Sequence, residues 1–273
     1  MTQDTEQKNT PDSPIPQPAP ASTGTGTELE QLKIENEKLK QINSVKSDVI
    51  SISAHQLRTS LSALKWILKM FLDKDVGPIT TEQEGFIQKA FNSNERMIAL
   101  VNDLLTLNHS EDTSIKFNFK KVDPLYLVEQ TIFEFSGETL KKSVPLVFLK
   151  PDMPIPQITC DEEMTRVVLQ NLIENSLKYS HPGDKVFVSL KHNEETKSVE
   201  FSVHDMGIGI TPEEQPKIFS KFFRAKNAQE KEVIGSGLGL YATKNIVERH
   251  KGKIWFESAP GKGTTFFVTL PIE

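Results

Sequence analysis

The stretch Ser53–Ser60, SAHQLRTS, begins an amphipathic helical pattern and decides how the N-terminal part of the chain is interpreted. At about 100° per residue, the leucines that follow form one apolar stripe: Leu57, Leu61, Leu64, Leu68 and Leu72. His55 falls on the face opposite that stripe, and we expect it in solvent. An exposed, neutral imidazole can attack a phosphoryl donor as a nucleophile. The alternative, a solvated histidine without a role, is the commoner one for a single histidine on a helix.

The segments on the N-terminal side of this helix differ sharply in composition. Residues 1–27 are rich in Pro, Thr, Gln and Ser and predict a disordered tail. Over residues 28–50, apolar residues recur at a spacing of seven between charged ones, which predicts a short parallel coiled coil. We expect the helix to continue to Asp73, before Gly77-Pro78 ends it.

A second amphipathic helix is predicted from Thr81 to Asn108. Its inward-facing residues would be Ile87, Phe91, Ile98, Val101 and Leu105. Together the two helices predict a hairpin domain over residues 45–112. Because a single hairpin buries its apolar stripes poorly, we expect two copies to pair into a dimeric four-helix bundle.

After Ser110 the pattern changes to short β-rich runs that alternate with helices. The predicted strands are Ile115–Val122, Leu146–Leu149, Val186–Leu190, Val199–Val203, Ile254–Glu257 and Thr265–Leu270. The predicted helices are Pro124–Lys142, Asp161–Tyr179 and Leu238–Lys251. This order predicts an α/β sandwich domain over residues 115–273.

Composition limits the partners and the compartment. The 273 residues carry a net charge of -5 and 37% apolar residues, which suits two folded domains and argues against a nucleic-acid partner. No run approaches the ~20 apolar residues that span a membrane. The single cysteine, Cys160, predicts a buried structural thiol and a reducing compartment. We therefore expect a cytoplasmic protein without a membrane segment.

The stretch Asn171–Tyr179, NLIENSLKY, places three polar side chains on one helix face. The amide oxygens of Asn171 and Asn175 can ligate Mg²⁺, and the ammonium of Lys178 can meet phosphate oxygens. Tyr179 offers a flat ring to a nucleotide base. Taken alone, the stretch could equally be an ordinary polar helix face.

Two glycine-containing stretches could complete a nucleotide site. In Asp205–Gly209, DMGIG, a carboxylate at a strand end can accept a hydrogen bond from an exocyclic amine, beside Gly207 and Gly209. In Gly235–Leu240, GSGLGL, a loop that opens a helix presents backbone N–H groups to phosphates. Its spacing is neither that of a dinucleotide fingerprint nor that of a P-loop. Each stretch could also be a plain turn.

Further candidates flank these stretches. Lys221 and Arg224 add positive charge ahead of the second glycine loop, in the run Phe219–Arg224. The run Gly261–Phe266 predicts a tight turn between the last two strands, with Thr264 as a candidate contact.

In this order and spacing, the stretches resemble the motifs of sensor histidine kinases. His55 matches the H box, Asn171–Tyr179 the N box, and Asp205–Gly209 and Gly235–Gly239 the two G boxes. Ile218–Arg224 matches the F box. The resemblance covers residues 45–273 and implies a dimeric helical hairpin followed by a Bergerat-type ATP-binding sandwich, like those of gyrase and the Hsp90 chaperones.

The resemblance also implies roles for individual residues. Asn175 would ligate Mg²⁺ that bridges the phosphates of ATP, with Asn171 in the same site and Lys178 on a phosphate. Tyr179 would pack against adenine and Asp205 would bind its amine. The loop Gly235–Gly239 would be the hinge and floor of the ATP lid, with residues 229–234 as its mobile part. The remaining candidate nucleotide contacts are Gly207, Gly209, Lys221, Arg224, Gly235, Gly237, Leu238, Gly239 and Thr264.

For the whole chain, the resemblance implies autophosphorylation of His55 and transfer of the phosphoryl group to an aspartate of a response-regulator receiver domain. Two positions depart from the family pattern. Gln56 stands where an acid usually follows the histidine, and Ser60 stands where proline is usual. An amide gives weaker base assistance than a carboxylate, and Ser60 predicts a straighter helix than proline would.

Two alternatives remain open, and the departures at Gln56 and Ser60 support only the first of them. One is a phosphatase-biased or non-catalytic ATP-binding scaffold, in which Gln56 and Thr59 would serve dephosphorylation of the partner. The other is a different enzyme on the same ATP fold, such as an ATPase chaperone or a serine kinase. An exposed histidine on an upstream hairpin argues against the second.

Overall fold

The computed structural model describes residues 24–111, 116–231 and 235–273. It divides into two compact units, Met1–Ile42 and Asn43–Glu273. In the first unit, the described residues belong to the N-terminal part of helix α1 (Gly24–Leu72), whose leucines Leu29, Leu32 and Leu39 are exposed. The sequence predicted a disordered tail up to residue 27 and a helix from Glu28, whereas α1 begins four residues earlier, at Gly24. Residues 1–23 of the predicted tail lie outside the described residues. No described helix has the length and apolar character needed to cross a membrane.

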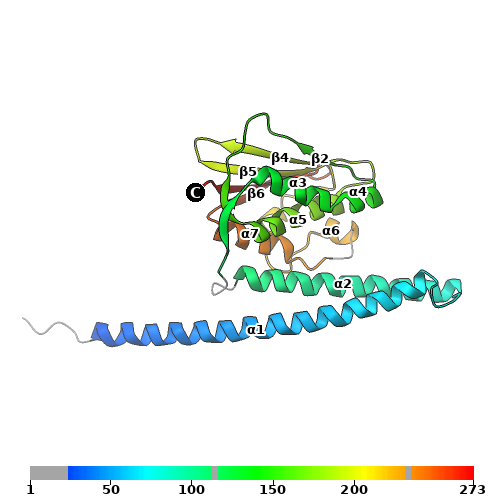
Figure 1. Ribbon diagram of the computed structural model, residues 1–273, viewed down its shortest axis with the longest axis horizontal. Helices are drawn as coiled ribbons and strands as arrows, with labels where there is room; N and C mark the ends of the chain where they lie inside the picture. Colours follow the sequence, from blue (N-terminus) through cyan, green and yellow to red (C-terminus); the bar gives the residue numbers. More distant parts are fainter. Residues whose placement is uncertain (1–23, 112–115, 232–234) are drawn as a thin grey trace, which may run out of the picture. The chain divides into compact units, whose positions relative to one another are not determined.

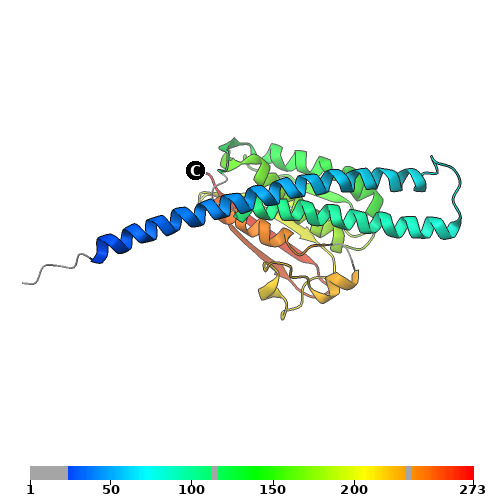
Figure 2. The same cartoon turned by 90° about the horizontal axis from the view of Figure 1, so that it is seen from below.

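In the second unit, α1 and helix α2 (Thr81–Glu111) form the predicted hairpin (Figures 1 and 2). A capping box starts α2: the Gln83 N–H donates to the Thr80 hydroxyl at 3.2 Å, and the Thr80 N–H donates to Gln83 Oε1 at 2.8 Å. Two amides of α2 reach across to the backbone of α1. Asn94 Nδ2 donates to Leu61 O at 2.9 Å, and Asn108 Nδ2 donates to Ser47 O at 3.1 Å. These bonds fix the register between the helices.

The predicted leucine stripe divides into two parts. Leu61, Leu68 and Leu72 are half-buried on the side that α2 covers, whereas Leu57 and Leu64 remain 51% and 40% exposed. At about 100° per residue, the two exposed leucines lie at one edge of the stripe and the three half-buried ones at the other, so α2 covers one edge only. Single-chain packing therefore accounts for only part of the stripe.

The rest of the second unit is an α/β domain with the five-stranded sheet order β2-β4-β5-β7-β6. Its strands are β2 (Leu146–Leu149), β4 (Val186–Asn193), β5 (Ser198–Asp205), β6 (Lys253–Ser258) and β7 (Thr264–Pro271). Strand β2 is parallel to β4, and all other pairs are antiparallel. Buried residues alternate along β4, β5 and β7, so one face of the sheet lies on the core.

Helices α5 (Glu162–Tyr179) and α7 (Gly239–Arg249) cover that face (Figure 1). The predicted helix Pro124–Lys142 is broken at Phe135 into α3 (Pro124–Glu134) and α4 (Ser136–Lys142). A second, two-stranded sheet pairs β1 (Phe119–Val122) with β3 (Ile158–Asp161), a strand that the sequence did not reveal. The short helices η1 (Gln215–Lys217) and α6 (Lys226–Lys231) were also not predicted.

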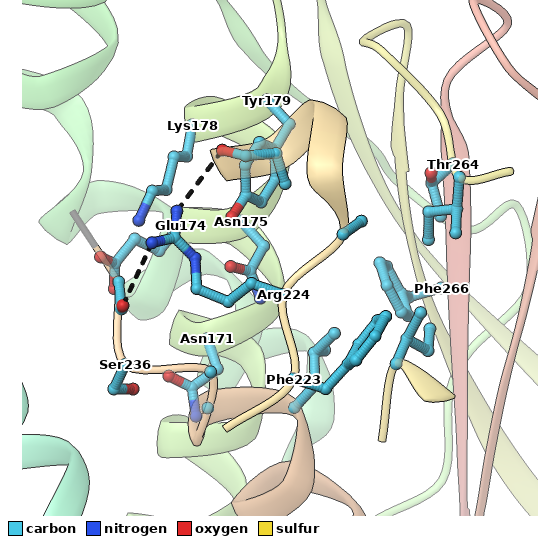
Figure 3. Close-up of a pocket in the computed structure, with 18 of the residues that line it drawn as sticks. Asn171, Glu174, Asn175, Lys178, Tyr179, Phe223, Arg224, Ser236, Thr264 and Phe266 are labelled. Carbon is cyan, nitrogen blue, oxygen red and sulfur yellow. Dashed lines mark hydrogen bonds between the residues drawn. The ribbon is translucent and has the colours of Figure 1, made fainter. Parts of the chain in front are cut away.

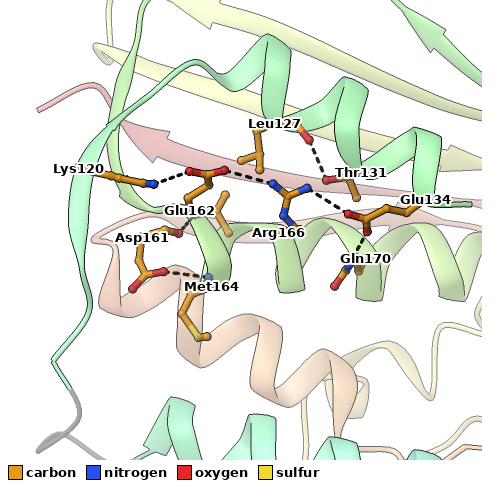
Figure 4. Close-up of polar contacts among 10 residues, drawn as sticks. Lys120, Leu127, Thr131, Glu134, Asp161, Glu162, Met164, Arg166 and Gln170 are labelled. Atoms are coloured by element: carbon orange, nitrogen blue, oxygen red, sulfur yellow. Dashed lines mark hydrogen bonds and ion pairs between the residues drawn. The ribbon is translucent and has the colours of Figure 1, made fainter.

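Helix α5 is held at several points outside the apolar core. Arg166 pairs with Glu134 of α3 and with Glu162 of its own first turn, both at 3.2 Å, and Lys120 of β1 pairs with Glu162 at 2.7 Å (Figure 4). Such partly exposed ion pairs each contribute little free energy. The fully buried Leu172 and Ile173 fix the helix more strongly. Cys160 is buried in β3, as predicted, and burial raises the pKa of its thiol.

Candidate functional site

A cavity of about 310 Å³ lies between α5, the segments around the two glycine stretches, and one face of α2 (Figure 3). Helix α5 supplies much of its polar wall. Asn171, Asn175 and Lys178 project into the cavity from one side of the helix, while Leu172 and Leu177 on the other side enter the core. The Asp161 carboxylate caps the start of this helix by accepting the Met164 N–H at 3.0 Å.

The two amides of α5 are presented differently. Asn171 Nδ2 donates to the Thr243 hydroxyl of α7 at 3.3 Å, which orients its side chain at the floor of the cavity. A Cβ on Gly239 would lie 3.5 Å from Asn171 Oδ1, an ordinary van der Waals distance. Asn175 lies one turn further along, on the same wall, next to Lys178 (Figure 3). A neutral oxygen donor beside an ammonium group is an arrangement suited to phosphate with bound Mg²⁺.

Asp205 lies at the end of β5, only 4% exposed. Its Oδ1 accepts the backbone N–H of Gly207 at 2.9 Å and that of Thr264 at 3.2 Å. The Ser176 hydroxyl donates to Oδ2 at 3.4 Å. Burial raises the pKa of Asp205, and the two backbone N–H groups partly offset that effect. A carboxyl held this rigidly can recognise a hydrogen-bond donor on a ligand.

The glycines of this stretch make room for neighbouring backbone. A Cβ on Gly207 would lie 2.3 Å from the carbonyl oxygen of Tyr179, and one on Gly209 would lie 2.0 Å from that of Ala259. Gly263, in the last turn, would place a Cβ 1.9 Å from the carbonyl oxygen of Asp205. These glycines therefore bring the chain close around Asp205. This is a packing role, whereas the sequence suggested room for a ligand.

The second glycine loop packs on the segment that precedes it. A Cβ on Gly237, whose φ is +73°, would lie 2.7 Å from the backbone of Phe222. Arg224 Nη1 donates to the Gly235 carbonyl and Nη2 to that of Ala228, each at 3.4 Å. Gly235 and Arg224 both line the cavity, and a Cβ on Gly235 would lie 3.1 Å from Lys178 Nζ. Residues 232–234, part of the expected mobile lid segment, lie outside the described residues.

Most predicted nucleotide contacts line the cavity: Asn171, Asn175, Lys178, Tyr179, Asp205, Gly209, Arg224, Gly235, Gly237, Gly239 and Thr264. Three others do not. Gly207 packs on Tyr179, and Leu238 is buried and caps α7. Lys221 pairs with Glu111 of α2 and lies 5.0 Å from the centroid of the Tyr241 ring.

The sequence also missed part of the lining. Ile208, Ile210, Phe223 and Phe266 form its apolar portion, and Glu174 stands between the two amides of α5. The position of Glu174, three residues after Asn171, was a signal that could have identified it. Asn102 and Asp103 of α2 also line the cavity, and no motif pointed to them.

His55 is exposed on α1, as predicted, and so are Gln56 and Thr59. The hydroxyl of Thr59 donates to the His55 carbonyl, and that of Ser60 to the Gln56 carbonyl, each at 3.1 Å. Helix α1 continues unbroken through this segment. One turn from His55, Arg58 Nε donates to Asn102 Oδ1 of α2 at 2.9 Å.

Two family models match the chain in the order in which these sites occur. Residues 45–113 match the His Kinase A (phospho-acceptor) domain, and residues 160–273 match the histidine kinase-, DNA gyrase B-, and HSP90-like ATPase. The chain belongs to the sensor histidine kinases. The sensor histidine kinase WalK of Bacillus subtilis is 34% identical over 242 residues, which cover 87% of this chain and 38% of WalK. The adaptive-response sensory kinase SasA of Crocosphaera subtropica is 32% identical, covering 90% of this chain and 64% of SasA.

Solved structures of histidine kinases share the fold. Full-length ShkA, in complex with AMPPNP, has a TM-score of 0.63 at 24% identity. The match covers 82% of this chain and 45% of the ShkA chain. The catalytic domain of ThkA, in a nucleotide-free form, has a TM-score of 0.50 at 27% identity. That match covers 57% of this chain and 97% of the ThkA domain. The chain thus spans less than two thirds of the length of WalK and SasA, while it contains both histidine kinase domains.

Proposed function

We propose that this histidine kinase transfers the γ-phosphoryl group of ATP to His55 and then to an aspartate of a response-regulator receiver domain. One observation carries the proposal: a solvent-exposed histidine and a nucleotide-sized cavity lined by amide, ammonium and carboxyl groups occur in the same chain. WalK and SasA, the relatives named above, are described as sensory kinases. Among the described residues, an exposed histidine and such a cavity form the two halves of a phosphoryl-transfer enzyme.

In the proposed transfer step, His55 is the nucleophile and ADP is the leaving group. The lone pair of one His55 ring nitrogen forms a bond to the γ-phosphorus, while the bond from that phosphorus to the bridging oxygen breaks and ADP leaves. The proton on the other ring nitrogen is lost to solvent, with Gln56 able to orient the ring and unable to accept a proton. Lys178 would neutralise charge on the phosphates and Asp205 would accept the adenine amine.

The donor set fits Mg²⁺ bound chiefly through the nucleotide. No group of three or more His, Cys, Asp or Glu side chains among the described residues could hold a metal ion. Asn175, with Asn171 beside it, would supply amide oxygen, and the remaining ligands would come from phosphates and water. Mg²⁺ supplies charge neutralisation on the phosphates when it is bound.

We also propose a homodimer formed through the hairpin. Apolar side chains on α1 and α2 are exposed in the single chain: Leu57, Leu64, Ile67, Phe71, Met97, Leu100 and Leu104. A second hairpin would bury them as a four-helix bundle. A supply of ATP and a reduced Cys160 both fit the cytoplasm as the compartment of this part of the chain.

The test is incubation of the purified chain with Mg²⁺ and γ-labelled ATP, followed by measurement of acid-labile, base-stable label. We expect label on the wild type and none on His55→Ala. His109→Ala is the matched control, because His109 is another histidine of the hairpin. Label that persists in His55→Ala would exclude His55 as the phosphoacceptor, and label lost only in His109→Ala would assign that role to His109.

A phosphatase-biased kinase is the second candidate function, favoured by the unbroken helix around Gln56 and Ser60. In that case Gln56 and Thr59, both exposed beside His55, would position water against the partner's phosphoaspartate. Gln56→Glu would then raise the autophosphorylation rate, because a carboxylate can accept the imidazole proton. An unchanged rate in Gln56→Glu would show that base assistance at this position does not limit the reaction.

A further inference from the structure

Helix α2 closes one side of the nucleotide cavity with an acidic side chain. Asp103 lies in the cavity lining with its neighbours Ala99 and Asn102. The hydroxyl of Ser236, in the second glycine loop, donates a hydrogen bond to Asp103 Oδ2. The same Ser236 oxygen accepts the backbone N–H of Leu238 at 3.0 Å, at the start of α7.

Charged groups of both signs lie around Asp103. Lys178 on α5 exerts an attractive charge on it, whereas Glu174 on the same helix repels it. Burial raises the pKa of Asp103, and the Ser236 hydroxyl and Lys178 act in the opposite direction. A glycine loop at the start of a helix and a lysine are the groups that bind nucleotide phosphates. Asp103 shares one cavity with Lys178 and bonds to Ser236 of the glycine loop, so its carboxylate lies where these groups would meet a phosphate.

A second set of contacts joins α2 to the catalytic domain outside this cavity. Glu111 accepts a hydrogen bond from the Tyr241 hydroxyl at 2.7 Å and pairs with Lys221 of the F box. Arg249 Nη1 donates to the His109 carbonyl at 2.9 Å. Glu111 is absent from the cavity lining. These bonds hold the two domains together without direct access to a nucleotide, and they provide a control for the contact made by Asp103.

We propose that Asp103 is an autoinhibitory group that takes the place of a nucleotide phosphate at the Ser236 loop, so that ATP and the docked hairpin compete for the loop. This inference rests on the proposed function, because it requires that the cavity binds ATP. When ATP enters, its phosphates meet the Asp103 carboxylate at short range, and the two like charges repel each other. Binding must therefore displace Asp103 from Ser236, which releases the hairpin from the catalytic domain at that point.

The proposal predicts a difference between ligands with and without phosphates. Adenosine carries the base and sugar that the Asp205 side of the cavity would recognise, and it has no charge to repel. We expect Asp103→Asn to tighten binding of Mg²⁺-ATP by about tenfold, the size of one charged hydrogen bond. We expect its affinity for adenosine to stay within about twofold, because the amide has the same shape as the carboxylate.

The experiment is calorimetric titration of the full chain with Mg²⁺-ATP and, separately, with adenosine, in the wild type, Asp103→Asn and Glu111→Gln. Glu111→Gln loosens docking outside the cavity, so it should leave the ratio of ATP to adenosine affinity close to that of the wild type. Asp103→Ala serves as a second variant if Asp103→Asn unfolds at a lower temperature than the wild type.

The outcomes distinguish failure of the Asp103 proposal from failure of the proposed function. A larger ATP-to-adenosine affinity ratio in the Asp103 variants alone supports the proposal. Equal gains for both ligands, equal ratios in Asp103→Asn and Glu111→Gln, or no gain for ATP would overturn it while ATP binding itself stands. If no variant binds either ligand, the nucleotide site fails as well, and the proposed function with it.

Discussion

Replacement of Ser60 by proline tests how the helix around His55 is held. In the structure, α1 runs unbroken past Ser60, whose hydroxyl also donates to the Gln56 carbonyl at 3.1 Å. Proline has no N–H to donate to that carbonyl, and its ring collides with the carbonyl four residues earlier. The Gln56 carbonyl would lose both of its donors from position 60, and the helix would bend next to the phosphoacceptor.

The magnitude follows from the position of Ser60 in the helix interior. Proline there costs about 3 kcal/mol or more, and this corresponds to a shift of about a hundredfold in the equilibrium between the closed and the locally open helix. Ser60→Ala is the matched control. It keeps the backbone N–H and removes only the hydroxyl bond, which adds little to helix stability, so the expected change lies within about 0.5 kcal/mol.

Hydrogen exchange of backbone amides in the hairpin measures the effect directly. We expect Ser60→Pro to speed exchange of the amides around Gln56 and Ser60 by about a hundredfold, while amides of α5 in the catalytic domain keep their rates. The autophosphorylation rate, measured in parallel, should change in Ser60→Pro and remain at the wild-type level in Ser60→Ala. Equal exchange in the two variants would refute the reasoning, because it would mean that the helix is already open at Gln56.

Five further substitutions have specific expected outcomes. Asp205→Asn should weaken ATP binding by about tenfold or more in a titration, because an amide replaces the buried carboxylate that would accept the adenine amine, and unchanged affinity would exclude Asp205 from base recognition. Gly263→Ala should lower the free energy of unfolding by about 2 kcal/mol or more, because its Cβ would lie 1.9 Å from the Asp205 carbonyl oxygen at a φ of +82°. Gly261→Ala, at a φ of +69° with open space around it, should cost about 1 kcal/mol, and equal losses in urea unfolding would contradict the packing role of Gly263. Leu172→Ala, at a fully buried position, should cost about 2 to 5 kcal/mol in the same assay, and a loss below 1 kcal/mol would place this helix outside the core. The last perturbation concerns pH. Burial lowers the pKa of His250 from 6.5, so the unfolded chain binds this proton more readily than the folded chain. The His250 contribution to stability should therefore be lost as the pH falls below 6.5, and His250→Gln should flatten the pH profile of stability there, whereas an unchanged profile would contradict this role.

Periodicity predicted the long elements well. The hairpin, the strands β2, β4, β5, β6 and β7, and helix α5 each lie within a few residues of their predicted bounds. Helix α5 was clear because Asp161 caps it and its apolar residues recur at helical spacing. Strand β3 was missed because it is short and follows Pro154 and Pro156, which favour a loop interpretation. The break at Phe135 was missed because apolar residues continue across it, although Gly137 nearby weakens the helix.

The candidate site was predictable where one element carries several of its residues. Asn171, Asn175 and Lys178 share a face of α5, and helical geometry alone places them together. Lys221 shows the opposite case. Its charge suggested a phosphate contact, but in the structure it pairs with Glu111, which lies more than a hundred residues earlier in the chain. Local sequence gives the charge of a side chain, and only tertiary packing decides which partner neutralises it.

The contact made by Asp103 could not be predicted from the sequence. In Val101–Leu107, VNDLLTL, it is the only ionisable residue within an apolar run, and an acid in such a run either faces solvent or has a buried partner. The helical pattern cannot distinguish these cases, because both place Asp103 away from Val101 on the hairpin core. The structure distinguishes them through Ser236 of the glycine loop, which donates to the carboxylate across the domain boundary. A charged residue in an apolar helical run therefore has either solvent or a partner distant in sequence beside it, and tertiary packing alone decides between the two.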